Sequence, residues 1–133
     1  MVARDEFCGL VVPVIKRADK KTLAEISRLE KLYTEKARSN KLTLDEMQGQ
    51  TIALSNLGVY GIESFFGITP PTASTILAVG NVVRTVVPGN GGMSSRKIIS
   101  LTLAVDHRVI NGDYAAIFLN FIIEQLQNPQ RLI

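Results

Sequence analysis

The residues best suited to chemistry lie near the end of the chain, in segment 106–112 (DHRVING). This segment contains His107, the only histidine, and Asn111 follows it by four positions. A neutral imidazole can remove a proton from a thiol or a hydroxyl near pH 7. The segment separates a predicted strand from a predicted helix, and such loops commonly direct side chains into a cleft. His107 is therefore a candidate general base, although a lone histidine is more often structural or solvated.

Two further polar residues have ordinary structural explanations. Asn is among the best N-cap residues, so Asn111 can simply begin the last helix. Ser55 lies in segment 55–58 (SNLG), whose small and polar residues predict a turn. Residue chemistry alone thus selects His107 and leaves Asn111 and Ser55 undecided.

In the first half of the chain, the pattern predicts one strand and one helix. The apolar run 9–15 (GLVVPVI) predicts a buried strand, and Pro13 indicates an edge position or an irregularity within it. Residues 22–39 have apolar side chains at helical spacing and predict an amphipathic helix. Segment 43–46 (TLDE) matches a capping box for one short helical turn.

In the second half, the pattern predicts several strands and a final helix. Residues 50–54, 76–87 (one or two strands) and 97–105 predict strands, with a turn at 88–92. The long loop at 59–75 is predicted to be functional or buried at a contact. The helix predicted at 112–127 is apolar nearly all round, so we expect it to be covered on more than one side, partly by another subunit.

Composition limits the class of protein. A chain of 133 residues fits one domain, and 46% hydrophobic with 20% charged residues excludes a disordered tail. No apolar run is long enough to span a bilayer, and no secretory signal is recognisable, so neither a membrane protein nor a secreted one is expected. The net charge of +3 is spread along the chain, which does not favour nucleic-acid binding. A single cysteine, Cys8, forms no internal disulfide and fits a reducing compartment.

Segment 106–112, followed by an apolar helix that ends in Asn-Pro, resembles the Asp-His-Arg-x-x-Asp-Gly motif of the dihydrolipoamide acyltransferases, with Asn111 where the family has Asp. The resemblance extends in the right order through further segments. They are 9–15 (GLVVPVI), 18–21 (ADKK), 45–49 (DEMQG), 55–58 (SNLG), 70–71 (PP) and 76–80 (ILAVG). It covers residues 9–133, the C-terminal part of the family's catalytic domain, and leaves residues 1–8 as a lead-in outside it.

The resemblance implies an α/β fold with a mixed sheet flanked by helices, like part of chloramphenicol acetyltransferase. It implies transfer of an acyl group, expected to be acetyl as in pyruvate-type members, between a dihydrolipoyl group and coenzyme A. In this family the histidine, here His107, is the base, and a hydroxyl that we place on Ser55 stabilises the oxyanion. Asn111 completes the implied site. Coenzyme A is a substrate, the lipoyl group is carried on a lysine of a separate domain, and no metal is implied.

The resemblance also implies an assembly. Family members form trimers in which the histidine and the serine come from neighbouring subunits, and the trimers build larger cores. The implied partners are copies of the chain, the lipoyl domain and the other dehydrogenase components. The implied location is the bacterial cytoplasm or the mitochondrial matrix.

Two departures favour a second hypothesis, a non-catalytic structural core subunit or a truncated remnant. Asn111 keeps the shape of the family aspartate but loses its charge, and the N-terminal portion of the family's catalytic domain does not appear in this sequence. A third possibility, antibiotic acetylation of the chloramphenicol acetyltransferase type, is disfavoured by the Asp-His-Arg form of the motif.

Overall fold

The computed structural model describes residues 2–3, 9–89 and 91–132. Its chain forms two compact units, one made of Met1–Thr51 with Ile117–Ile133 and the other of Ile52–Ala116. We call them the first and the second unit and describe each by itself. Most of the expected lead-in at 1–8, including Cys8, lies outside the described residues.

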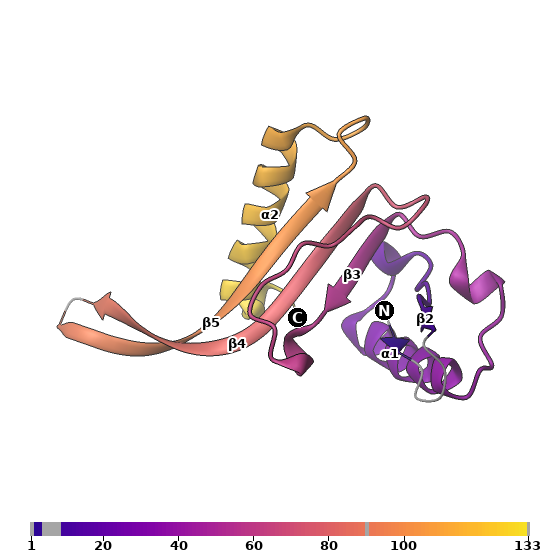
Figure 1. Cartoon of the computed structure of the whole chain (residues 1–133), viewed down its shortest axis with the longest axis horizontal. Helices are drawn as coiled ribbons and strands as arrows, with labels where there is room; N and C mark the ends of the chain where they lie inside the picture. Colours follow the sequence, from indigo (N-terminus) through magenta and orange to yellow (C-terminus); the bar gives the residue numbers. More distant parts are fainter. Residues whose placement is uncertain (1, 4–8, 90, 133) are drawn as a thin grey trace. The chain divides into compact units, whose positions relative to one another are not determined.

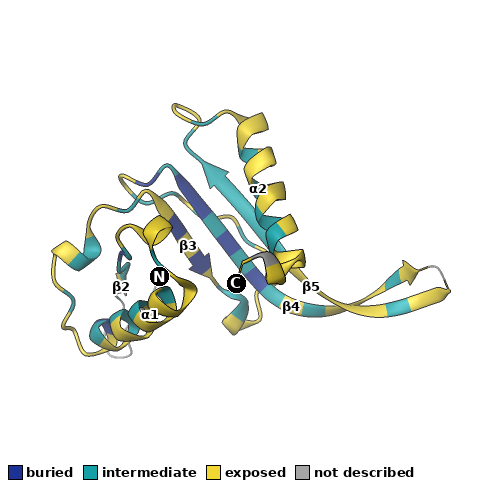
Figure 2. Ribbon diagram, turned by 180° about the vertical axis from the view of Figure 1, so that it is seen from behind, coloured by how far each residue is buried: buried dark blue, intermediate teal, exposed yellow. Residues whose placement is uncertain are grey.

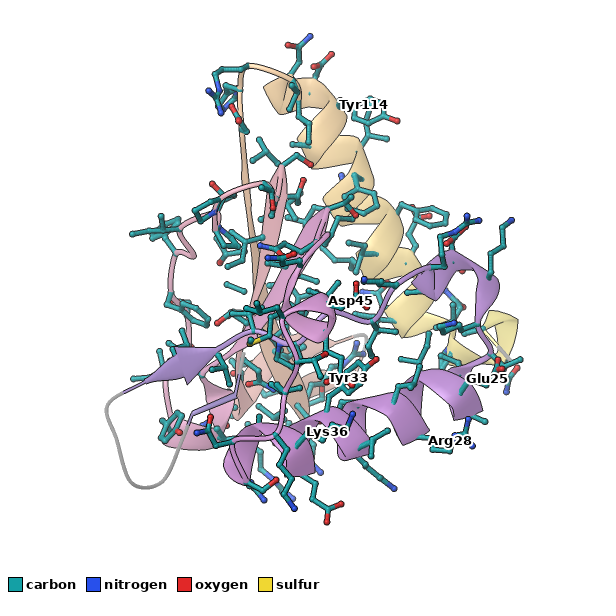
Figure 3. All side chains as sticks on the ribbon, turned by 90° about the vertical axis from the view of Figure 1, so that its right-hand side faces the viewer. Glu25, Arg28, Tyr33, Lys36, Asp45 and Tyr114 are labelled. Atoms are coloured by element: carbon teal, nitrogen blue, oxygen red, sulfur yellow. The ribbon has the colours of Figure 1, made fainter. Side chains whose placement is uncertain are left out.

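The first unit is built around the predicted helix, observed as α1 (Leu23–Arg38). Thr22 caps α1 through a reciprocal capping box with Glu25, which satisfies backbone donors that a helix start leaves open. Lys36 of α1 forms an ion pair with Glu46, and its Nζ lies 6.0 Å from the centre of the Tyr33 ring (Figure 3). The helix prediction for residues 22–39 is confirmed.

The predicted capping box at 43–46 is also observed. Thr43 and Glu46 exchange backbone-to-side-chain hydrogen bonds, and a short 3-10 helix, η2 (Asp45–Met47), follows. Because Glu46 also accepts from Lys36, this turn is tied to α1.

The predicted buried strand at 9–15 is wrong in extent and in burial. Only β2 (Leu10–Val11) forms, paired antiparallel with β1 (Val2–Ala3), and Leu10 is 60% exposed. Pro13 has no N–H to continue a ladder, and the N–H of Val14 donates to the Glu46 carbonyl instead. Burial therefore begins only at Val14.

The second unit is organised by a three-stranded mixed sheet in the order β3-β4-β5 (Figure 1). These strands are β3 (Ile52–Asn56), β4 (Thr75–Gly89) and β5 (Gly92–Val105). β3 pairs parallel with β4, and β4 pairs antiparallel with β5. Residues 76–87, expected as one or two strands, belong to a single strand.

The boundary of β3 differs from the prediction and changes the setting of Ser55. The strand runs to Asn56 because Ser55 pairs with Ala78 and Asn56 with Val79. Ser55 is therefore a mid-sheet residue, and the prediction that it lies in a turn is wrong. The turn begins after it, at the short 3-10 helix η3 (Gly58–Tyr60).

One face of this sheet is buried and is made largely of small residues (Figure 2). Ala53 and Ser55 of β3 share it with Ile76 and Ala78 of β4, because paired residues in a sheet point to the same side.

Residues 62–67, which we call the covering segment, pass over β4 on this face. A Cβ added at Gly80 would lie 1.9 Å from the Glu63 carbonyl oxygen, and one added at Gly67 would lie 2.8 Å from the Ile76 side chain. The amide of Asn81 also donates to the Ile62 carbonyl at 2.7 Å. The segment thus approaches the strand closely and in the opposite direction. Most residues of the long loop at 59–75 are nonetheless exposed, with Phe66 at 87%, so its expected functional role or burial at a contact stays a prediction.

Beyond the β3 partner, β4 and β5 continue as a long hairpin. The pairing is irregular between Val79 and Val82, and from Val82 to Gly89 the partners lie on β5 alone. Apolar side chains of this part are exposed, among them Val86 at 61% and Met93 at 71%.

The last helix is α2 (Gly112–Gln127), as predicted. It contains no buried residue, and Ile117, Phe121 and Leu126 are each more than half exposed. Among the described residues, no helix has the length and apolar character required to cross a membrane.

We predict that Gly80→Ala destabilises the second unit. The added methyl group meets backbone atoms of Glu63, which cannot rotate away as a flexible side chain would, so the cost should be about 1–3 kcal/mol or more. Thermal and urea unfolding followed by circular dichroism would measure it.

Gly91→Ala is the matched control, because a Cβ there meets nothing within 4 Å. Equal unfolding midpoints for the two variants would contradict the close approach of the covering segment.

Candidate active site

The turn that carries His107 begins as the β5 ladder ends. The N–H of Asp106 donates to the Ser74 carbonyl at 2.8 Å, which extends the pairing of β4 and β5 by one step. The Asp106 carbonyl then accepts from the N–H groups of Val109 and Ile110, both at 3.0 Å. These bonds close a tight turn around His107, whose side chain is exposed.

The Asp106 carboxylate also binds Arg108, the residue that follows His107 in the sequence. It accepts the Arg108 backbone N–H at 3.0 Å and the guanidinium at 2.9 Å from Nε and 2.6 Å from Nη2. The guanidinium hydrogen bonds and then the backbone hydrogen bond lower the pKa of Asp106 from 3.8 to about 2. The same pairing raises the pKa of Arg108. The carboxylate is therefore ionised throughout the neutral range.

His107 lies against the start of α2. A Cβ added at Gly112 would be 3.7 Å from His107 Cε1, which is ordinary van der Waals contact. The Asn111 carbonyl accepts from the N–H of Ala115 at 3.0 Å, so Asn111 occupies the N-terminal flank of the helix, as its sequence position indicated. The structure therefore brings His107 and Asn111 together in one turn.

Ser55 has a different environment. It is 2% exposed on the small-residue face, and its hydroxyl makes no hydrogen bond to the described part of the chain. A buried hydroxyl without a partner costs about 1–3 kcal/mol, so such groups usually bind water or a ligand. This buried donor is the structural feature that distinguishes Ser55 from an ordinary serine.

A single chain does not bring Ser55 and His107 together. Ser55 is level with Ala78 and Thr102, whereas His107 follows Val105 at the opposite end of the sheet. Three residues along a strand and two strand spacings separate Ser55 from Val105, which is about 14 Å between Cα atoms. The arrows in Figure 1 show this arrangement, with β3 and β5 running in opposite directions. A base and a donor for one reacting group must each lie about 3 Å from it.

Two structural elements of this region were missed by sequence reasoning. The first is the pairing of Asp106 with Arg108, which the two charges flanking His107 could have suggested. The second is the covering segment, whose glycine contacts leave no periodic signal. Within the described part of the chain, no group of three or more potential metal ligands occurs.

A family model for the 2-oxoacid dehydrogenase acyltransferase catalytic domain matches residues 2–133. The chain belongs to this acyltransferase family. The match begins before Gly9 and continues to the last residue.

Individual relatives agree with the family assignment. The chain is 42% identical over 128 residues to the mitochondrial dihydrolipoyllysine-residue acetyltransferase component of the Schizosaccharomyces pombe pyruvate dehydrogenase complex, covering 94% of this chain and 26% of that protein. It is 37% identical over 137 residues to the mouse mitochondrial pyruvate dehydrogenase protein X component, and this match covers 98% of this chain and 27% of that protein. Relatives of this chain include mitochondrial and bacterial forms.

Among solved structures, the dihydrolipoamide acetyltransferase of Azotobacter vinelandii matches with a TM-score of 0.88 and 34% identity, covering 98% of this chain and 53% of that one. The expected α/β fold with a mixed sheet is confirmed. A serine, a histidine and an asparagine were investigated for their role in the catalytic mechanism of that enzyme. There, the serine precedes the histidine by 52 residues, and the asparagine follows the histidine by four.

The chain thus spans about half the length of the solved chain and between a quarter and a third of the curated relatives.

We predict that Arg108→Met raises the pKa of Asp106 from about 2 toward 3.8, because the guanidinium is the largest cause of the depression. A carboxyl with a depressed pKa contributes stability above its unfolded pKa and loses it as the pH falls through the folded value. At pH 3 the wild-type carboxylate should remain mostly ionised, whereas a larger fraction of the Asp106 carboxyl should be protonated in Arg108→Met. The ¹³C shift of the Asp106 carboxyl reports the difference.

Arg28→Met, which removes a guanidinium from the first unit, is the control. An unchanged Asp106 titration in Arg108→Met would contradict the ion pair.

Proposed function

We propose that this chain transfers an acetyl group between a dihydrolipoyl thiol and coenzyme A, with His107, Ser55 and Asn111 forming the site. One observation carries the proposal. Ser55 precedes His107 by 52 residues, and Asn111 follows His107 by four. The same two intervals separate the serine, histidine and asparagine that were investigated in the catalytic mechanism of the Azotobacter vinelandii enzyme. Overall likeness of fold adds support, since the two chains match with a TM-score of 0.88.

The same comparison changes the interpretation of Asn111. An asparagine occupies this interval in a solved acetyltransferase, so its presence here does not argue for an inactive remnant. We propose that Asn111 contributes an uncharged amide beside His107.

His107 acts as the base in this proposal. Only a few per cent of an ordinary thiol, with a pKa of about 8.5, is thiolate near pH 7. The imidazole takes the proton of the coenzyme A thiol as its sulfur attacks the acetyl carbon of the acetyl-dihydrolipoyl thioester. The tetrahedral intermediate then expels the dihydrolipoyl thiolate, which takes the proton from the imidazolium. The products are acetyl-CoA and the dihydrolipoyl dithiol.

Ser55 supplies the donor for the negative oxygen of the intermediate. Its hydroxyl is buried and makes no hydrogen bond to the described residues, so it can donate to a substrate oxygen without first breaking an internal bond. At 2% exposure Ser55 is closed to solvent in the single chain.

The site requires more than one copy of the chain. Since about 14 Å of sheet separates Ser55 from the end of β5, His107 of one copy must meet Ser55 of another. Exposed apolar residues on α2 and on the β4–β5 hairpin supply surface for such contacts. We propose a trimer, as the family resemblance implies, which builds a larger core.

The remaining partners follow from the reaction. The lipoyl group arrives on a separate domain, and coenzyme A is a substrate rather than a resident cofactor. We place the chain in a pyruvate dehydrogenase complex of the bacterial cytoplasm or the mitochondrial matrix. Its relatives include both a mitochondrial and a bacterial component of such complexes.

A second candidate is a structural core subunit without turnover. The 37% identity to the mouse protein X component favours it, because the name of that relative does not describe a transferase. It predicts assembly without acetyl transfer, which separates it from the first proposal.

We predict that the purified chain transfers acetyl from acetyl-CoA to dihydrolipoamide and that His107→Ala lowers kcat by about 10²–10⁴. Ser55→Ala should lower kcat by about 10²–10³ through loss of the oxyanion donor. Transfer is measured by mass spectrometry of the S-acetyl-dihydrolipoamide product.

Asn111→Asp and Asn111→Ala complete the series. The aspartate variant retains hydrogen-bonding oxygens and should keep more activity than the alanine variant. The kcat of the alanine variant should fall about tenfold. A folded, oligomeric wild-type chain without any transfer would overturn the catalytic proposal and favour the structural subunit.

A further inference from the structure

The turn around His107 depends on one residue, Asp106. Its N–H bonds to Ser74, its carbonyl accepts from Val109 and Ile110, and its carboxylate accepts four hydrogen bonds from Arg108. All polar groups of Asp106 are therefore engaged in fixing the chain immediately before and after His107.

The carboxylate has a particular geometric role. Because it accepts both the backbone N–H and the guanidinium of Arg108, it bridges the two residues that flank His107. A bridge from position 106 to position 108 restricts the backbone between them, and the backbone dihedrals determine which side-chain rotamers His107 can adopt.

Global stability is a poor explanation for this ion pair. The Arg108 side chain is 88% exposed, and exposed ion pairs generally contribute little because water screens them. Forked binding of a guanidinium to both carboxylate oxygens instead provides a fixed direction. The exposed guanidinium therefore serves local geometry.

We propose that Asp106 is a positioning residue for His107, holding its backbone through the Arg108 bridge so that the imidazole keeps one orientation. This inference rests on the proposed role of His107 as the base. The low pKa of Asp106 supports it, because the carboxylate stays ionised and able to accept at every pH at which the transfer would run.

The test combines kinetics with a direct view of the imidazole in the full, assembled chain. His107 is the only histidine, so ¹³Cε1-labelled histidine gives one signal from this site. Asp106→Asn should lower kcat about 10²-fold, the penalty for a misplaced catalytic group, with the KM values for acetyl-CoA and dihydrolipoamide within about twofold. The histidine signal should broaden or divide, and hydrogen exchange at Val109 and Ile110 should speed up.

Asp113→Asn is the matched control. It removes the same charge from the first turn of α2 without touching the Arg108 bridge, and kcat and the histidine signal should stay as in the wild type. Equal losses in the two variants would show that charge, and not the bridge, matters, which would overturn the proposal.

Arg108→Gln keeps the proposal testable if Asp106→Asn does not fold. It removes the guanidinium and leaves the backbone bond, so an intermediate loss of kcat and partial broadening are expected. Unchanged kcat and a single sharp signal in both bridge variants would overturn the positioning role.

The two proposals fail differently. If the wild type and His107→Ala are equally inactive, the function fails, while the imidazole signal still shows whether Asp106 orders the turn. If the wild type is active and Asp106→Asn has the same kcat and the same histidine signal, only the positioning role fails.

Discussion

The pairing register of the three-stranded sheet is the constraint on which the rest of the account depends. Parallel pairing of β3 with β4 and antiparallel pairing of β4 with β5 set Ser55 level with Thr102 and send His107 past the other end of β5. A shift of one residue would also turn Ser55 to the opposite face of the sheet. The register thus buries the serine hydroxyl and separates it from the histidine. A single copy contains both chemical groups but no complete site.

The two halves of the proposed site are held by different physical means. Ser55 is held by close packing, since its face consists of small residues and Gly80 lets the covering segment approach β4. His107 is exposed and is held by the hydrogen bonds of a short turn. Packing makes Ser55 a fixed, buried donor, whereas the turn makes the orientation of His107 depend on Asp106 and Arg108. We therefore expect the histidine side of the site to be the more sensitive to polar substitutions nearby.

Much of this fold could be predicted from the sequence because it follows from local patterns. The two helices have clear apolar periodicity, and Thr22 and Pro129 mark where α1 begins and where α2 has ended. The strand at 9–15 was predicted wrongly because an apolar run cannot show that its partner within the described residues is a strand of two residues. The burial of Ser55 depends on its pairing with Ala78, which lies 23 residues further along the chain. No local pattern contains that information.

The site could be predicted only in part for the same reason. His107 is predicted by its chemistry and Ser55 and Asn111 by family resemblance, whereas the bridge from Asp106 to Arg108 is seen only in the structure. The central claim is that one copy supplies His107 and another supplies Ser55. Mixing His107→Ala with Ser55→Ala under conditions that exchange subunits tests it directly. Random assembly of a closed ring pairs an intact His107 with an intact Ser55 at about a quarter of the sites, so about a quarter of wild-type activity should return. If the mixture stays as inactive as the separate variants while exchange of subunits is demonstrated, the shared site is contradicted.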